Sequence, residues 1–252
     1  MKMENREPKI VCFVCNFAFC QDEIELPDNV NVARVNCIGR LDPVTVVEMF
    51  EKGIDAVMLA GCKPPDCHFV EGNAQAELAV RLLKKFLLLA GLEPNRIKLV
   101  WYSPVEEENL GDCVSKYYEA VKGFSNSLES KQQQPEFVVN LSAIKNAFSN
   151  FQLRVLLGRE KELTEEVNVY GEKLSRGEFD TLLDDIVKTE FIRQKIYVLA
   201  RCVPMSIKGL SESTNLKSAE VLGHIVNMRR KNLIAFDHLE GQTPFYKALE
   251  VN

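Results

Sequence analysis

The sequence predicts an α/β fold, in which an open, mostly parallel sheet flanked by helices is followed by a mainly α second domain. Short continuous apolar runs alternate with amphipathic helical segments in the first half, which is typical of βαβ units. After a polar stretch near residue 130, the periodicity becomes helical. At 252 residues the chain is long enough for one large or two ordinary domains.

The first domain is expected to contain four buried strands and three helices. The helix that follows the second strand has Asp42 as its N-cap, Pro43 in its first turn and Gly53 at its end. The next helix is long and stops at Gly91. We expect strands over 9–15, 31–36, 55–60 and 97–102, and helices after Asp42-Pro43, over about 71–90 and over about 105–123.

A polar, Gln-rich segment with a proline near its end follows, and we interpret it as a linker. It separates the first domain from a helical one that begins with helices over 137–158 and about 178–202. The predicted domains are therefore 1–124 and 137–252, with the linker at 125–136.

The last fifty residues follow a third pattern. A short helix is expected over 206–210, and the polar turn SESTN separates it from an amphipathic helix over 216–231. Two strands, Ile234 to Leu239 and Thr243 to Leu249, surround the turn Glu240-Gly241. Helix, turn, helix and β-hairpin is the order of a winged helix, which we predict at about 204–252.

The composition fits a cytoplasmic globular protein. No apolar run reaches the roughly 18 residues that a membrane-spanning helix needs, so no membrane partner is expected. The N-terminal residues are polar and lack the apolar stretch of a secretory signal. The net charge of −5 does not indicate nucleic-acid binding. In the cytoplasm, clustered cysteines are more often metal-binding or catalytic than disulfide-bonded.

Five cysteines lie at or just past the ends of predicted strands. Because the ends of parallel strands meet along one edge of a sheet, residues far apart in sequence converge there. Thiolates are ligands for zinc or for iron–sulfur clusters, and ligands from three separate strands suit a cluster better than a structural zinc site. Residue chemistry alone leaves [2Fe–2S] and [4Fe–4S] open. The five residues are Cys15, Cys20, Cys37, Cys62 and Cys67.

The remaining cysteines fit plainer interpretations. Cys12 lies in the middle of a strand, and Cys113 and Cys202 are isolated on helices, so we interpret all three as packing residues. A redox-active dithiol normally needs a C-x-x-C at a helix start, whereas Cys12 and Cys15 lie within a strand. Beside the cluster, His68 is a candidate hydrogen-bond donor to the ligands and Arg40 a candidate to offset their negative charge.

Four segments together resemble one family: CFVCNF, RVNCIGRLDP, GCKPPDCHFVEGN and LVWYSPVE. They are similar to the delta subunit of methyl-viologen-reducing hydrogenase, an iron–sulfur family that accompanies heterodisulfide reductase, over about residues 8–122. The resemblance implies a [2Fe–2S] cluster and an electron-transfer role in anaerobic metabolism. The partners it implies are an electron-donor oxidoreductase and a flavin- and iron–sulfur-bearing protein like the A subunit of heterodisulfide reductase. Such complexes can carry out electron bifurcation.

Carried over by position, the family ligands are Cys15, Cys37, Cys62 and Cys67. Where the family often has Cys-Asn-x-Cys, this chain has Ala18 in place of the second cysteine. Cys20 is therefore a reserve ligand.

Two functions are compatible with these features. The first is an electron-transfer subunit, not itself catalytic, whose second domain docks to a partner. The second is a metal-responsive regulator that reads DNA through its winged helix. Residues 204–252 carry six Lys/Arg against five Asp/Glu, a net charge of +1, which favours the first. No Gly-rich phosphate loop, paired-carboxylate motif or nucleophile elbow indicates a self-contained enzyme.

Overall fold

The computed structural model describes residues 6–18, 26–102 and 110–250. Its contacts divide the chain into two compact units, Met1–Val138 and Val139–Asn252. The domain boundaries expected from the sequence stay a prediction, but the segment expected as a linker is not structureless. It contains helix α4 (Ser125–Gln132), because Leu128 is buried against the first unit and Gln132 Nε2 donates to Phe50 O at 2.9 Å.

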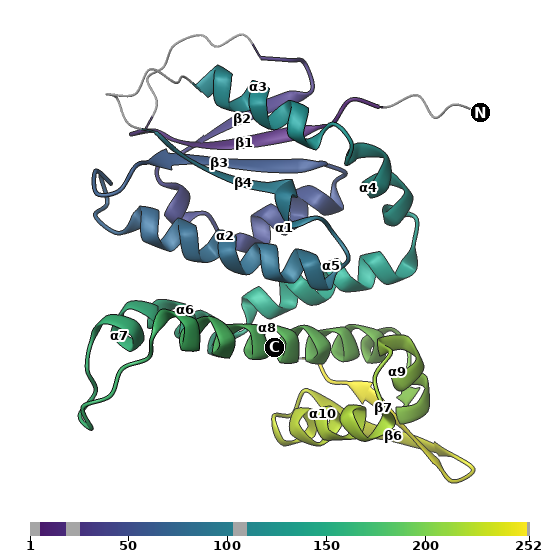
Figure 1. Cartoon of the computed structure of the whole chain (residues 1–252). Coiled ribbons are helices and arrows are strands. Elements are labelled where there is room, and N and C mark those ends of the chain that lie inside the picture. The colour runs from purple at the N-terminus through teal and green to yellow at the C-terminus, as the bar shows by residue number, and fades with distance from the viewer. Residues whose placement is uncertain (1–5, 19–25, 103–109, 251–252) are drawn as a thin grey trace. The chain divides into compact units, whose positions relative to one another are not determined.

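The first unit is built on a four-stranded parallel sheet, as the sequence predicts, and its strand order is β2-β1-β3-β4 (Figure 1). Every residue of the two central strands is buried, which explains why both are apolar throughout. The strands are β1 (Ile10–Cys15), β2 (Val30–Val35), β3 (Ala56–Cys62) and β4 (Ile97–Tyr102).

Helices cover both faces of this sheet. Helix α3 (Leu110–Val121) lies on one face, and α1 (Pro43–Glu51) and α2 (Gly72–Leu89) lie on the other (Figure 1). Asp42 caps α1 as predicted, since its Oδ1 accepts from Val44 N at 3.0 Å. Two short 3₁₀ helices, η1 (Ile38–Arg40) and η2 (Pro94–Arg96), precede α1 and β4.

Arg96 joins several of these elements from a fully buried position. Its guanidinium donates to Glu93 Oε2 at 2.6 Å, to Asp55 O at 2.9 Å and to Phe124 O at 2.8 Å. The charge also lies over the Phe124 ring, 5.1 Å from its centroid. One side chain thus ties η2, the start of β3 and the start of α4 together.

The prediction of a single helix over 137–158 is wrong, because the chain leaves the helical conformation at Asn150 and two helices result. The longest helix of the second unit, α8 (Arg176–Cys202), begins at a capping box in which Ser175 and Glu178 satisfy each other's backbone N–H groups. The helices that precede α8 are α5 (Pro135–Ser149), α6 (Phe151–Gly158) and α7 (Glu160–Glu165). Helix α5 begins in the first unit and continues into the second.

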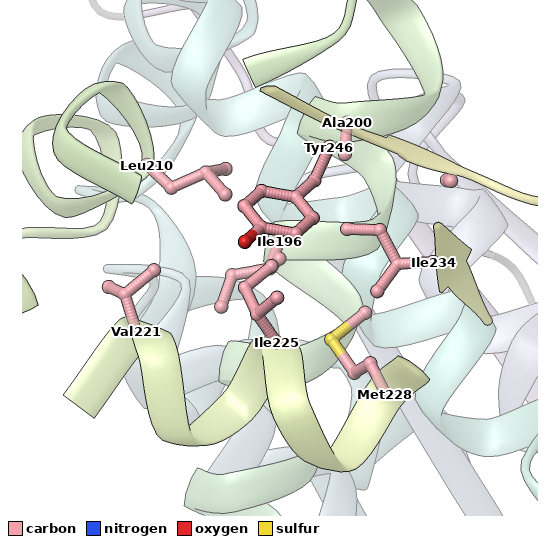
Figure 2. Packing of buried hydrophobic residues seen from close by; sticks show 9 residues of the cluster. Ile196, Ala200, Leu210, Val221, Ile225, Met228, Ile234 and Tyr246 are labelled. Carbon is pink, nitrogen blue, oxygen red and sulfur yellow. The ribbon is translucent and has the colours of Figure 1, made fainter. Parts of the chain in front are cut away.

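The C-terminal elements pack around a buried core that includes Ile196, Ile225 and Tyr246 (Figure 2). Antiparallel pairing gives a three-stranded sheet of order β5-β7-β6. The order of elements is the one that the sequence predicts, and their designation as a winged helix stays a prediction. They are β5 (Met205–Ser206), α9 (Ile207–Thr214), α10 (Ser218–Arg230), β6 (Ile234–Glu240) and β7 (Thr243–Ala248).

The SESTN segment is not a turn. It continues α9 to Thr214, where the Ser213 and Thr214 hydroxyls donate to backbone carbonyls one turn back, and the helix stops where Asn215 adopts a left-handed conformation, φ 56°. Within the described residues, no helix is both long enough and apolar enough to cross a membrane.

Replacing Arg96 with Met should destabilise the first unit by about 3 kcal/mol, since two buried carbonyls would lose their donors. Urea unfolding followed by circular dichroism measures the change. Lys122→Met, which removes the exposed partner of Glu119, should change stability by no more than about 0.5 kcal/mol. Equal effects of the two substitutions would show that Arg96 does not anchor these elements.

Candidate metal centre

Two of the predicted ligands meet at the ends of the central strands. Cys15 is the last residue of β1 and Cys62 the last residue of β3. The parallel register, which pairs Val14 with Ala60, brings both to the same edge of the sheet. Their sulfurs are 3.8 Å apart, and both residues are buried.

The other two predicted ligands lie against the start of α2. Cys37 follows β2 as the residue before η1, and Cys67 belongs to the loop that leaves β3. Gly72 is the first residue of α2, and both sulfurs lie in the space that a side chain at this position would need. A Cβ at this position would collide with Cys37 Sγ and lie 3.1 Å from Cys67 Sγ. Only glycine allows the helix to begin this close to the two cysteines.

Cys15 and Cys67 both affect the pKa values of Cys62 and Cys37, so the four cysteines lie close enough to form one cluster. Burial raises the pKa of the Cys62 thiol to about 11, and the neighbouring Cys15 and Cys67 raise it too. The pKa of Cys37 is likewise raised, first by burial and then by Cys67 and Cys15. Four thiolates crowded together in a buried site repel one another, so they are stable only with a cation between them.

Backbone N–H groups point at the cluster. Gly39 and Arg40 donate to Cys37 Sγ, and His68 donates to Cys62 Sγ, which lowers the pKa of each thiol against the effect of burial. Such donors stabilise sulfur in its charged form and tune the potential of a bound iron–sulfur cluster.

His68 and Arg40 therefore reach the centre through their backbone. The His68 imidazole stacks on the Phe17 ring with centroids 3.7 Å apart and an interplanar angle of 9°, and Phe69 packs edge-on against both. Arg40 has an exposed side chain. The roles expected for the two side chains, a hydrogen-bond donor to the ligands and a charge partner, stay predictions.

The remaining cysteines differ in position. Cys20 lies outside the described residues, so its role as a reserve ligand is not addressed by the structure. Cys12 is buried in the middle of β1, where burial raises its pKa to about 12. Cys113 lies half-buried on α3 and Cys202 ends α8, both on helices as expected, but Cys202 is exposed, so its interpretation as a packing residue is wrong. Ala18, at the departure from the family pattern, is buried, and its N–H donates to Cys15 O at 3.1 Å.

The donor set consists of thiols. Among the described residues, no three His, Cys, Asp or Glu side chains form a site for a single metal ion. Cys15, Cys37 and Cys62 are buried and Cys67 is half-buried. Gly72 leaves room for the Cys37 and Cys67 sulfurs, and thiolates are the usual ligands of iron–sulfur clusters.

The residues that pack around the four cysteines and His68 were not expected from the sequence. Gly72 and Gly39 pack backbone against backbone, because a Cβ on Gly39 would collide with Gly72 O. The available signal was a glycine close to each cysteine segment, in CIGR and in CHFVEGN. No feature of the sequence indicated that Phe17 and Phe69 would pack around His68.

A family model described as methyl-viologen-reducing hydrogenase, delta subunit, matches residues 10–125. A protein of Archaeoglobus profundus, named as the iron-sulfur D subunit of F420-non-reducing hydrogenase, is 36% identical over 121 residues, which cover 45% of this chain and 88% of the relative. The chain belongs to the methyl-viologen-reducing hydrogenase delta-subunit family. The family match covers β1 to α3 and the start of α4, and it includes all four predicted ligands.

Some relatives of the first unit are matched over most of their length, and others are matched over one segment of a longer chain. A Methanococcus voltae protein, named as the vhc iron-sulfur D subunit of F420-non-reducing hydrogenase, is 32% identical over 126 residues, 47% of this chain and 88% of the relative. In Methanosarcina mazei, the similar segment is 15% of a longer chain, named as the A subunit of ferredoxin:CoB-CoM heterodisulfide reductase. That match is 32% identical over 117 residues, 44% of this chain.

Gly72→Ala should abolish iron binding, because the added methyl group occupies space that the Cys37 and Cys67 sulfurs need. Iron per chain after anaerobic purification measures this. Gly123→Ala is the matched control, since a Cβ there meets no atom within 4 Å. Full iron content in the Gly72 variant would show that α2 does not limit the position of these cysteines.

Proposed function

We propose that this chain is a non-catalytic electron-transfer subunit that holds a [2Fe–2S] cluster on Cys15, Cys37, Cys62 and Cys67. It relays electrons between a donor oxidoreductase and a flavin- and iron–sulfur-bearing protein like the A subunit of heterodisulfide reductase. The observation that carries the proposal is the gathering of four cysteines at one sheet edge, with the Cys15 and Cys62 sulfurs 3.8 Å apart and the Cys37 and Cys67 sulfurs both beside Gly72.

The spacing of the Cys15 and Cys62 sulfurs fits one tetrahedral metal ion. A tetrahedral site with metal–sulfur bonds of about 2.3 Å places two ligand sulfurs about 3.8 Å apart. The Cys15 and Cys62 sulfurs are separated by 3.8 Å. In the proposed centre these two cysteines would bind one iron, and Cys37 and Cys67, which both lie beside Gly72, would bind the other. The choice of two irons rests on the family resemblance, because a zinc ion accepts the same sulfur spacing.

The surrounding residues would hold the centre in place and set its properties. When bound, the cluster supplies one-electron transfer. The strand ends and Gly72 position the sulfurs, and the N–H groups of Gly39, Arg40 and His68 stabilise their negative charge. Beside the buried cysteines, Phe17 and Phe69 offer partly exposed aromatic rings, a surface that a partner could cover.

The proposed partner rests on how the relatives are built. In Methanosarcina mazei, a segment similar to this domain is part of the heterodisulfide reductase A-subunit chain itself. Domains that are joined in one chain in one organism often associate as separate subunits in another. We therefore propose that this domain docks to a flavoprotein of that type, in a multi-subunit complex of the kind that can bifurcate electrons.

For the C-terminal elements we propose docking to a protein partner. Helix α10 exposes Leu222 and Val226, one turn apart, on a surface that DNA recognition would use for polar side chains. At its N-terminal end, Glu220 Oε2 accepts from Lys217 N, which places a carboxylate where phosphates would have to approach. The alternative of a metal-responsive DNA-binding regulator is less well supported by these features.

Anaerobically purified protein should be brown and contain about two irons per chain. Cys62→Ser should lose this iron and the visible absorption, because one member of the close sulfur pair is removed. Cys202→Ser, at the exposed end of α8, should keep both.

A second set of variants addresses the reserve ligand. If Cys20→Ser retains two irons, the four described cysteines are sufficient. A colourless protein with one zinc per chain, or a Cys62 variant with unchanged iron, would contradict the proposed centre.

A further inference from the structure

Strand β4 is the free edge of the parallel sheet. It pairs only with β3 in the order β2-β1-β3-β4, so among the described strands none covers its other side. The middle of the strand is only half-buried, at Leu99, Val100 and Trp101, although these residues are apolar. Residues of α2 on one face of the sheet and of α3 on the other reach this edge, among them Lys84 and Lys116.

A pocket of about 650 Å³ lies along this edge. Its volume falls within the range of small-molecule sites, which is roughly 300–1,000 Å³. Apolar and aromatic side chains from β4 and α3 form part of the lining, among them Leu99, Trp101 and Tyr117. All lining residues belong to the first unit.

All charged side chains among the described lining residues are positive. Lysines come from four places: the residue after β3, α2, β4 and α3. No acidic side chain is among the described lining residues. This is unusual on a chain whose net charge is −5. The four are Lys63, Lys84, Lys98 and Lys116.

The positive charges of Lys84 and Lys98 repel each other. Burial lowers the pKa of Lys84, and the positive charge of Lys98 lowers it further. Neither lysine makes an ion pair with a carboxylate in the part of the chain that the structure describes. A ligand with negative charge would relieve this repulsion. Because Lys84 is partly buried, its attraction to such a ligand would be less screened by water than at an exposed site.

We propose that this pocket binds a small organic anion that carries at least two negative charges, on phosphate or carboxylate groups, together with a flat apolar part. The lysines would contact the charged groups, and Trp101 with its apolar neighbours would contact the rest. The described pocket lining contains none of the four predicted ligand cysteines, although Lys63 directly follows Cys62, and the proposal does not depend on the proposed electron transfer. Lysines can also serve only to prevent edge strands from aggregating, in which case the pocket would bind nothing.

Trp101 provides a direct readout because it is the only tryptophan in the chain. The intact protein is titrated with ADP, citrate, pyrophosphate and uncharged adenosine while its fluorescence is recorded. We expect a saturable change with ADP or citrate, weaker binding of pyrophosphate, and no binding of adenosine. ADP and citrate distinguish phosphate from carboxylate as the preferred group.

Lys84→Gln combined with Lys98→Gln should weaken the tighter ligand by about tenfold or more. Lys52→Gln, an exposed lysine of the same unit outside the pocket, should leave affinity unchanged. Each single Lys→Gln variant is measured as well, so that a misfolded double variant does not decide the outcome. No saturable change with any of the anions, or equal affinity in the double variant and wild type, would overturn the proposal. Binding of a Glu-rich peptide but of none of the small anions would also overturn it, in favour of strand addition to β4.

Discussion

The parallel pairing of β1 with β2 and β3 is the constraint on which the candidate metal centre depends. Cys15, Cys37 and Cys62 are separated by many residues in sequence, and only the in-register sheet brings their strand ends to one edge. A shift of one residue in the β1–β3 register would move one strand end by about 3.3 Å along the other and change the 3.8 Å separation of the Cys15 and Cys62 sulfurs. The fully buried central strands make such a shift costly, because it would move a whole set of apolar side chains.

The second requirement is the close approach of α2 to this edge. Cys67 belongs to a loop, and loops are usually less well determined than strands. Here the loop is confined between Cys62, where β3 ends, and Gly72, where α2 begins. The packing of Gly39 against Gly72 holds η1 and α2 together, so Cys37 and Cys67 are positioned by backbone contacts instead of by long side chains. Such an arrangement gives a bound metal a rigid set of ligands.

Much of this architecture could be predicted from the sequence. All four strands of the first unit and the long helix α2 were expected within a residue or two, because continuous apolar runs and amphipathic periodicity are strong local signals. The convergence of cysteines followed from topology alone. What could not be predicted depends on tertiary contacts. Helix α4 was expected as a linker because its sequence is polar, and its few contacts, such as buried Leu128, are invisible without the fold. The stacking of His68 on Phe17 joins two loops that no local pattern relates.

The most direct test of the proposed centre is the mass of the anaerobically purified chain, measured by native mass spectrometry under conditions that retain metals. The proposed centre predicts one dominant species whose added mass equals two irons and two sulfides, and this species should vanish when all four ligand cysteines are replaced by serine. A dominant species with four irons and four sulfides, or with a single zinc, would contradict the assignment of one sulfur pair to each of two irons.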